Sequence, residues 1–120
     1  MKLVNLTPHS IVLRDPAGAD HVIPPSGQVA RVRTIPGAPE NVDGIPVPVF
    51  GADEFGAVDG LPECPEPDAF FIVSLAVGQA LAAAGHPLAC RCVRPGTGPA
   101  DGAIREDGRI VAVTRLVRVA

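Results

Sequence analysis

The sequence lacks the features by which membrane and secreted proteins are usually recognised. Its longest apolar stretch, residues 69–85, is shorter than the roughly 20 residues that a membrane-spanning helix needs and contains Gln79. Residues 1–10 carry one positive charge and no long apolar run followed by a small-residue cleavage site, so we expect no signal peptide. The sequence therefore predicts a cytoplasmic protein without a membrane partner.

Cysteine is scarce, and three cysteines cannot all pair within one chain, which weakens the case for a disulfide framework. Cys90 and Cys92 lie two apart in a predicted strand, residues 87–93, so their side chains share one face. Together with Cys64 and a histidine they could bind zinc, but no C-x-x-C or H-x-x-x-H spacing occurs. Small buried thiols are the favoured interpretation, and we expect neither a metal nor a cofactor.

Basic residues are also few. Lys2 is the single lysine among ten basic residues, and 13 acidic residues give a net charge of -3. Modules that bind duplex nucleic acid usually carry a basic face, so we expect no duplex nucleic acid partner. A length of 120 residues and a hydrophobic content of 47% predict a single domain, residues 1–120.

Short strand-like runs dominate both ends of the chain. Residues 2–6 and 10–14 are β-type runs separated by T-P-H, where proline predicts a bend. A turn then leads to residues 21–23, and residues 28–35 alternate as a strand of a meander does, with one face towards solvent or ligand. Near the carboxyl terminus, Asp107-Gly108 predicts a two-residue hairpin turn.

Residues 36–68 are dense in proline, glycine and acidic residues, which nearly excludes helix. A structureless loop of this length is unusual inside a compact domain. We expect a hairpin, or an excursion that covers a sheet edge or reaches a neighbouring subunit. Intrinsic disorder is the alternative.

One helix is predicted, between two strands. Residues 69–74 form a continuous apolar run typical of a buried strand. Ser74 suits the N-cap of a helix over 75–84, Gly85 its left-handed end, and Pro87 prevents continuation. Because only Gln79 is clearly polar, we expect this helix to be buried in the fold or against another subunit, in a homo-oligomer. With the returning strand it predicts a parallel βαβ unit, and hence an α+β fold: a small, mostly β domain of meander and hairpins with one buried helix.

The carboxyl edge of a parallel βαβ unit favours ligands, because both strand ends and the helix amino terminus meet there. Unpaired N–H groups, glycines and an arginine at this edge suit a phosphate or carboxylate. The expected ligand-binding residues are Ser74, Leu75, Arg94, Gly96, Thr97 and Gly98. The segment is neither G-x-x-x-x-G-K-[ST] nor G-x-G-x-x-G, so a simple cap, a glycine turn and a solvated arginine are the alternative.

Two further groups of residues are candidates. Asn5, Thr7 and His9 cluster at the first bend, where Asn and Thr could satisfy the backbone of the bend and His9 could donate a hydrogen bond or act as an acid or base. Arg31 and Arg33 share one strand face and could clamp an anion, although such arginines are more often solvated. Ser74 lacks the G-x-S-x-G elbow, and an enzyme is less favoured than a binding protein.

Four segments resemble a family of small proteins encoded by actinobacteria and tailed phages, and the resemblance covers nearly the whole chain. They contain N-L-T-P-H at 5–9, I-P-P-S-G at 23–27, I-V-S at 72–74 and V-x-P-x-T-G-P at 93–99. Gly96 stands where that family has an acidic residue. The resemblance implies a compact domain, and the phage association suggests sequestration of a nucleotide signal of host defence. We therefore expect a module that binds an anionic, nucleotide-like molecule; the alternative is a homo-oligomeric interaction domain without ligand or catalysis.

Overall fold

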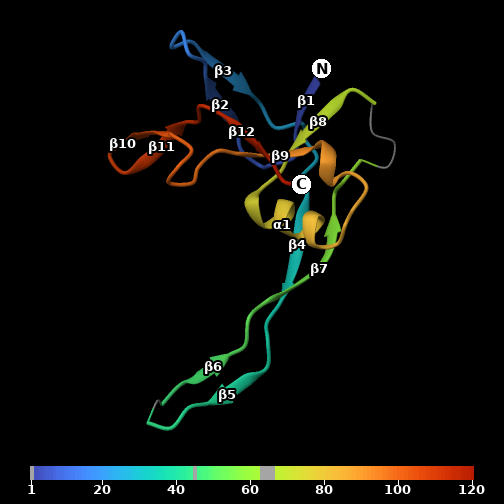
Figure 1. Ribbon diagram of the computed structural model, residues 1–120, viewed down its shortest axis with the longest axis vertical. Helices are drawn as coiled ribbons and strands as arrows, with labels where there is room; N and C mark the ends of the chain where they lie inside the picture. The colour runs from blue at the N-terminus through green and yellow to red at the C-terminus, as the bar shows by residue number, and fades with distance from the viewer. Residues whose placement is uncertain (1, 45, 63–66) are drawn as a thin grey trace.

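The computed structural model describes residues 2–44, 46–62 and 67–120. Its central sheet has the strand order β1-β8-β9-β12 (Figure 1). Strands β1 (Lys2–Asn5), β8 (Ala69–Ile72) and β9 (Cys92–Pro95) run parallel, and β12 (Leu116–Arg118) is antiparallel to β9. The predicted α+β class is confirmed.

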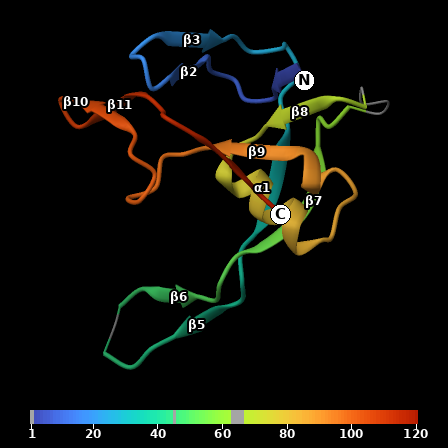
Figure 2. The same ribbon diagram turned by 45° about the horizontal axis from the view of Figure 1, so that its top comes forward.

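Helix α1 (Leu75–Ala83) joins β8 to β9 and completes the predicted βαβ unit. The Ser74 side chain accepts a hydrogen bond from the backbone N–H of Val77, and Gly85 ends the helix at a φ of +61°, so both predicted caps are confirmed. Figure 2 shows α1 between the sheet and strands β4 (Arg31–Ile35) and β7 (Glu54–Asp59).

The core forms where the inward face of the sheet meets α1. Alternate residues of β8 share that face because side chains of a strand point to opposite sides in turn. The buried cluster contains Leu6, Ala30, Ala69, Phe71, Val73, Val77, Leu81, Ala89 and Cys92. Only one face of α1 takes part, and Leu75 at the start of the helix is 54% exposed.

Two hairpins flank the sheet. Strands β2 (Ile11–Arg14) and β3 (Asp20–Ile23) form the first, and β10 (Ile104–Glu106) and β11 (Arg109–Ala112) form the second. Asp107 and Gly108 have φ angles of +51° and +77°, as a two-residue turn with both central residues left-handed requires. The hairpin predicted from Asp107-Gly108 is confirmed.

The central segment forms a long hairpin that projects from the body (Figure 1). Strand β4 pairs with β7, and β5 (Pro39–Asn41) pairs with β6 (Pro48–Phe50) further out. Residues 34–59, which we call the arm, give the molecule a length of 56 Å against a width of 40 Å and a depth of 23 Å. The predicted hairpin is confirmed, while its reach to a neighbouring subunit stays a prediction.

Two details differ from the sequence-based expectations. Strand β4 does not extend the β2–β3 hairpin as a meander would; it pairs with β7. The strand predicted over 87–93 is wrong up to residue 91, because residues 87–88 form a turn, Ala89–Arg91 is a 3-10 turn and β9 starts at Cys92. The His86 ring accepts from the N–H of Leu88, which holds the turn, and Cys90 is exposed while Cys92 is buried. The two thiols therefore do not share a strand face.

Candidate functional site

Three strand ends meet at one edge of the sheet, as the parallel arrangement of β1, β8 and β9 requires. The N-L-T-P-H bend follows β1, Ser74 and the helix start follow β8, and the glycine-rich turn at 96–98 follows β9. The predicted common direction of the strands before Ser74 and Thr97 is therefore present. The N-L-T-P-H bend, the start of α1 and the glycine-rich turn, which the sequence indicated separately, therefore all lie at this edge.

Asn5 organises the first bend. Its side chain is 1% exposed, and its Nδ2 donates to the backbone oxygens of His9 and Ile23, at 2.8 and 3.1 Å. Its Oδ1 accepts from the N–H and the hydroxyl of Thr7, at 2.9 and 2.6 Å. Because these bonds use the full capacity of the amide, Asn5 satisfies the backbone of the bend, as an Asx-type turn does.

His9 is exposed, and its backbone oxygen rather than its ring takes part in the bend. The Thr7 hydroxyl lies 3.0 Å from that oxygen as well as 2.6 Å from Asn5 Oδ1. A hydroxyl has one hydrogen to donate, so these two acceptors share it. The His9 ring therefore stays outside the hydrogen-bonded network of the bend.

The glycine-rich turn is held by a carboxylate of the same chain. Asp101 Oδ2 accepts the N–H of Gly98 at 2.9 Å and lies 3.4 Å from the Arg94 guanidinium. The N–H of Gly96 donates to Arg115 O, and that of Thr97 to Pro95 O. The groups expected to bind an external anion at this turn thus already have partners. Sequence reasoning missed Asp101, although an acidic residue three positions after Gly98 is a signal for such a cap.

The start of α1 leaves two donors unused. The N–H of Val77 is taken by Ser74 Oγ at 3.3 Å, whereas no acceptor among the described residues engages the N–H groups of Leu75 and Ala76. The first turn of the helix contains no acidic residue. This helix end therefore keeps its partial positive charge and open hydrogen-bonding positions.

A hollow of about 320 Å³ adjoins this helix start, and its wall includes Thr7, Arg31, Ser74 and Ala76. Arg31 begins β4 and makes no ion pair within the described part of the chain, even though Asp59 lies opposite it in the β4–β7 register. One unpaired guanidinium and a helix amino terminus thus border the same space. No acidic residue is among the described residues that line this hollow.

The remaining candidates lie elsewhere. Arg94 and Leu75 border a second hollow on the other side of α1, and Thr97 borders a third, beside β2 and β11. Arg33 is exposed on β4 and lines none of these three spaces. The structure thus brings Thr7, Arg31 and Ser74 together and separates them from Arg94 and Thr97.

Ser74 and Cys92 carry the hydroxyl and thiol groups that could act as nucleophiles beside these elements. Within the described chain, Ser74 Oγ contacts a backbone N–H and no acidic or histidine side chain. Burial raises the pKa of the Cys92 thiol to about 11, with a smaller contribution from Cys90, so this thiol stays protonated at neutral pH. Among residues 2–44, 46–62 and 67–120, no three His, Cys, Asp or Glu side chains gather as a metal site would need; Cys64 lies outside those ranges.

Comparison with known proteins gives no match: neither a family model nor a curated protein nor a solved structure is similar to this chain. No helix in the described ranges has the length and apolar character to cross a membrane.

Proposed function

We propose that this protein binds an anionic small molecule, of the nucleotide class, in the hollow between Thr7, Arg31 and Ser74. The binding serves capture rather than turnover, because the hollow offers donors and positive charge without a nucleophile paired to a base. Capture of a signalling nucleotide, as the resemblance to phage proteins suggests, is the biological form that we propose for this activity.

The observation that carries the proposal is the position of Arg31. Its guanidinium forms no ion pair among the described residues and borders the same hollow as Ala76, whose backbone N–H has no acceptor in the described part of the chain. A guanidinium binds a phosphate or carboxylate through two parallel hydrogen bonds, and helix N–H groups add the dipole. The two together recognise an anion at two points.

The size of the hollow limits the ligand. Small-molecule sites enclose about 300–1,000 Å³, and about 320 Å³ is near the lower limit. Leu6, Val29 and Val32 add an apolar wall beside the polar groups. A mononucleotide, with one phosphate and one flat base whose faces are apolar, fits this combination better than a larger cofactor.

Equilibrium dialysis against mono-, di- and cyclic nucleotides tests the proposal. We expect binding that Arg31→Ala weakens about tenfold to a hundredfold, because a charge-assisted hydrogen bond contributes about 1.5–3 kcal/mol. Arg33→Ala is the matched control, since it removes the same charge two residues along the same strand without lining the hollow. The proposal is contradicted if the two variants lose nucleotide affinity equally, or if the natural protein binds none of the nucleotides.

The Arg94→Ala, Thr97→Ala double variant separates this hollow from the turn that sequence analysis favoured. We expect nucleotide binding to be unchanged, because Asp101 already occupies the donors there. If the double variant loses nucleotide binding while Arg31→Ala binds as the natural protein does, the binding site is at the 94–98 turn and not in this hollow.

A homo-oligomeric interaction domain is the second candidate function. It is favoured by the exposed apolar side chains of the arm, such as Val47 at 58% and Phe50 at 56% exposure. Side chains of this size are usually buried when they cluster. The two functions use different surfaces of the molecule, so one does not exclude the other.

A further inference from the structure

The arm exposes an unusual concentration of large apolar side chains. Six of the ten exposed large hydrophobic residues of the described chain lie on it: Ile35, Val42, Val47, Val49, Phe50 and Phe55. In the β5–β6 pair, Phe50 lies opposite Pro39 and Val49 opposite Glu40, so apolar side chains point from both faces of a two-stranded ribbon. A lone ribbon cannot bury both faces, and the arm therefore needs an external surface.

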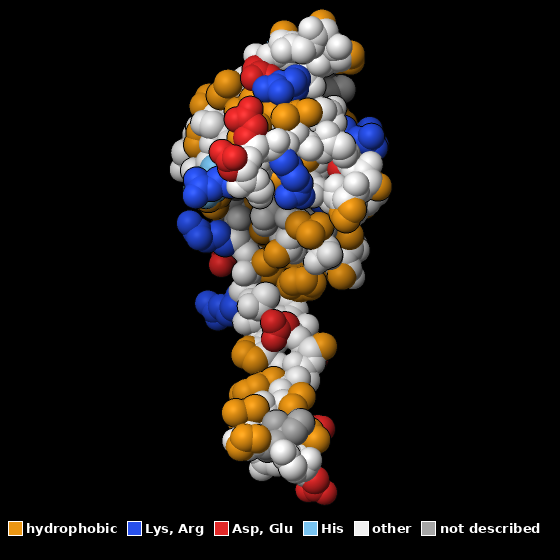
Figure 3. Space-filling view, turned by 90° about the vertical axis from the view of Figure 1, so that its left-hand side faces the viewer, with side chains coloured by type: hydrophobic (Ala, Val, Ile, Leu, Met, Phe, Trp, Pro, Cys, Tyr) orange, Lys and Arg blue, Asp and Glu red, His pale blue; other side chains and the backbone are white. Residues whose placement is uncertain are grey.

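The arm also carries charge of one sign. Residues 34–59 contain five acidic residues and no basic residue, while the rest of the chain holds all ten basic and eight acidic residues. Figure 3 shows hydrophobic and acidic side chains over the outer part of the arm. A surface that covers the arm should therefore combine apolar side chains with positive charge.

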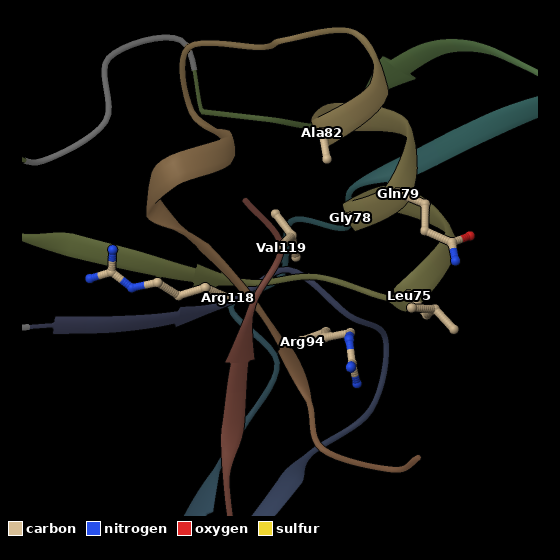
Figure 4. Close-up of a pocket in the computed structure, with 7 residues that line it drawn as sticks. All are labelled: Leu75, Gly78, Gln79, Ala82, Arg94, Arg118 and Val119. Carbon is tan, nitrogen blue, oxygen red and sulfur yellow. The ribbon is translucent and has the colours of Figure 1, made fainter. Parts of the chain in front are cut away.

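The body of the same molecule offers such a surface. A hollow of about 390 Å³ lies along the exposed side of α1, bordered by Leu75, Ala82, Val119 and Arg94 (Figure 4). Gly78 and Ala82 leave it open because they are small and lie one helical turn apart. Among the described residues, the one ion pair of Arg94 is the long 3.4 Å contact to Asp101. The Arg118 guanidinium lies over the ring of Phe70.

We propose that the tip of the arm of one copy occupies this hollow on a second copy of the chain. Phe50 and Val47 would pack against Leu75, Ala82 and Val119. Asp43 would accept a hydrogen bond from Arg94 Nε or Nη2, which have no partner among the described residues because Asp101 and Pro95 engage Nη1. In both ribbon views the arm extends away from the body, so the tip lies far from α1 of its own chain (Figures 1 and 2). The contact is therefore between molecules.

A closed assembly follows from this arrangement. One arm and one hollow on each copy are different surfaces, so a one-sided contact leaves another arm and hollow free. Reciprocal exchange between two copies, or a ring, uses all of them.

Analytical ultracentrifugation and light scattering over a concentration series test the proposal. We expect an oligomer for the natural chain and at least about tenfold weaker association for Phe50→Ser. Val22→Ser, which changes an equally exposed residue of β3, is the control. On the receiving side, Ala82→Glu places an acidic group in the hollow and should weaken association to the same extent, whereas Ala83→Glu, its exposed neighbour on α1, should not.

A mixing experiment distinguishes arm-into-hollow docking from pairing between arms. Phe50→Ser keeps an intact hollow and Ala82→Glu keeps an intact arm, so the two variants should form a mixed complex that neither forms alone. The proposal would be overturned if the natural chain were still monomeric at about 100 μM. It would also be overturned if Ala82→Glu did not weaken association, or if the two variants formed no mixed complex. Arg31→Ala should leave association unchanged, which separates this test from that of nucleotide binding.

Discussion

Asp101 accepts the N–H of Gly98 at 2.9 Å and also lies 3.4 Å from Arg94, so one carboxylate holds both ends of the turn after β9. The sequence of this turn suggested a place for an external anion, and the chain supplies the anion itself. The Asp101 carboxylate thus occupies the place at the Gly98 N–H that the sequence had suggested for an external anion.

Replacing Asp101 should expose that latent anion site. In Asp101→Ala, the N–H of Gly98 and the Arg94 guanidinium lose their partner, and we expect about 1–3 kcal/mol of lost stability. Phosphate at millimolar concentration should then raise the melting temperature of the variant more than that of the natural protein. Thr97→Ala is the control, because its side chain contributes no hydrogen bond in the described turn; an equal phosphate response in all three proteins would contradict the assignment.

Substitution of Asn5 should destabilise the fold more than substitution of most other polar residues. Asn5→Ala removes the bonds to Thr7, His9 and Ile23 from a buried position. We expect a loss of about 3 kcal/mol or more in the free energy of unfolding, measured by urea denaturation, because unpaired buried polar groups cost about 1–3 kcal/mol each. Thr7→Ser, which keeps the hydroxyl, should cost clearly less. A loss under about 1 kcal/mol for Asn5→Ala would show that water replaces the amide.

Gly78 is required by the packing of α1 on the chain after β12. A Cβ at this position would lie 2.6 Å from Val119 Cγ1. Gly78→Ala should therefore destabilise the protein by about 1–3 kcal/mol through overpacking, although alanine favours helix by about 1 kcal/mol. Adding Val119→Ala should recover much of this loss, and a double-mutant cycle by thermal unfolding measures the coupling. Additive effects would place the cause elsewhere.

The acid stability of the β2–β3 hairpin should depend on Asp15. Hydrogen bonding from His21, followed by the N–H groups of Ala19 and Ala17, lowers the pKa of Asp15 below its ordinary value of 3.8. A carboxyl whose folded pKa is lowered stabilises the fold above its unfolded pKa, and that stabilisation is lost as the pH falls through the lowered folded pKa. Asp15→Asn should thus melt below the natural protein at pH 7, and this difference should shrink below about pH 4.

The matched control for this pH dependence is Asp53→Asn, which removes a carboxylate of the arm that forms no hydrogen bond among the described residues. Its melting temperature should follow the natural protein across the same range. A constant difference between Asp15→Asn and the natural protein from pH 7 to about pH 2 would contradict the linkage.

Local signals allowed the helix and the turns to be predicted. Ser74, Gly85 and Asp107-Gly108 act within a few residues of themselves, so their caps and turns follow from neighbouring backbone groups. The pairing of β4 with β7 joins residues 19 to 28 positions apart and depends on how the arm leaves the body. The 3-10 turn at Cys90 depends on the His86 ring, which the β-type pattern of 87–93 did not reveal.

The sequence indicated individual residues of the candidate site but not which of them lie together. The sequence indicated Ser74 and Arg31 separately, but only the crossing of β4 beside the start of α1 brings them to one hollow. Conversely, Arg94 and Ser74 are near the ends of adjacent strands and border different sides of the helix. Side-chain direction around α1, rather than strand order, decides which residues act together.

The segregation of acidic residues on the 34–59 segment makes this molecule an electric dipole along its 56 Å axis. Two such molecules that approach in dilute salt are turned by their mutual field so that the negative extremity of one faces the positive region of the other. The encounter rate between copies should therefore decrease as ionic strength rises and the Debye length shortens.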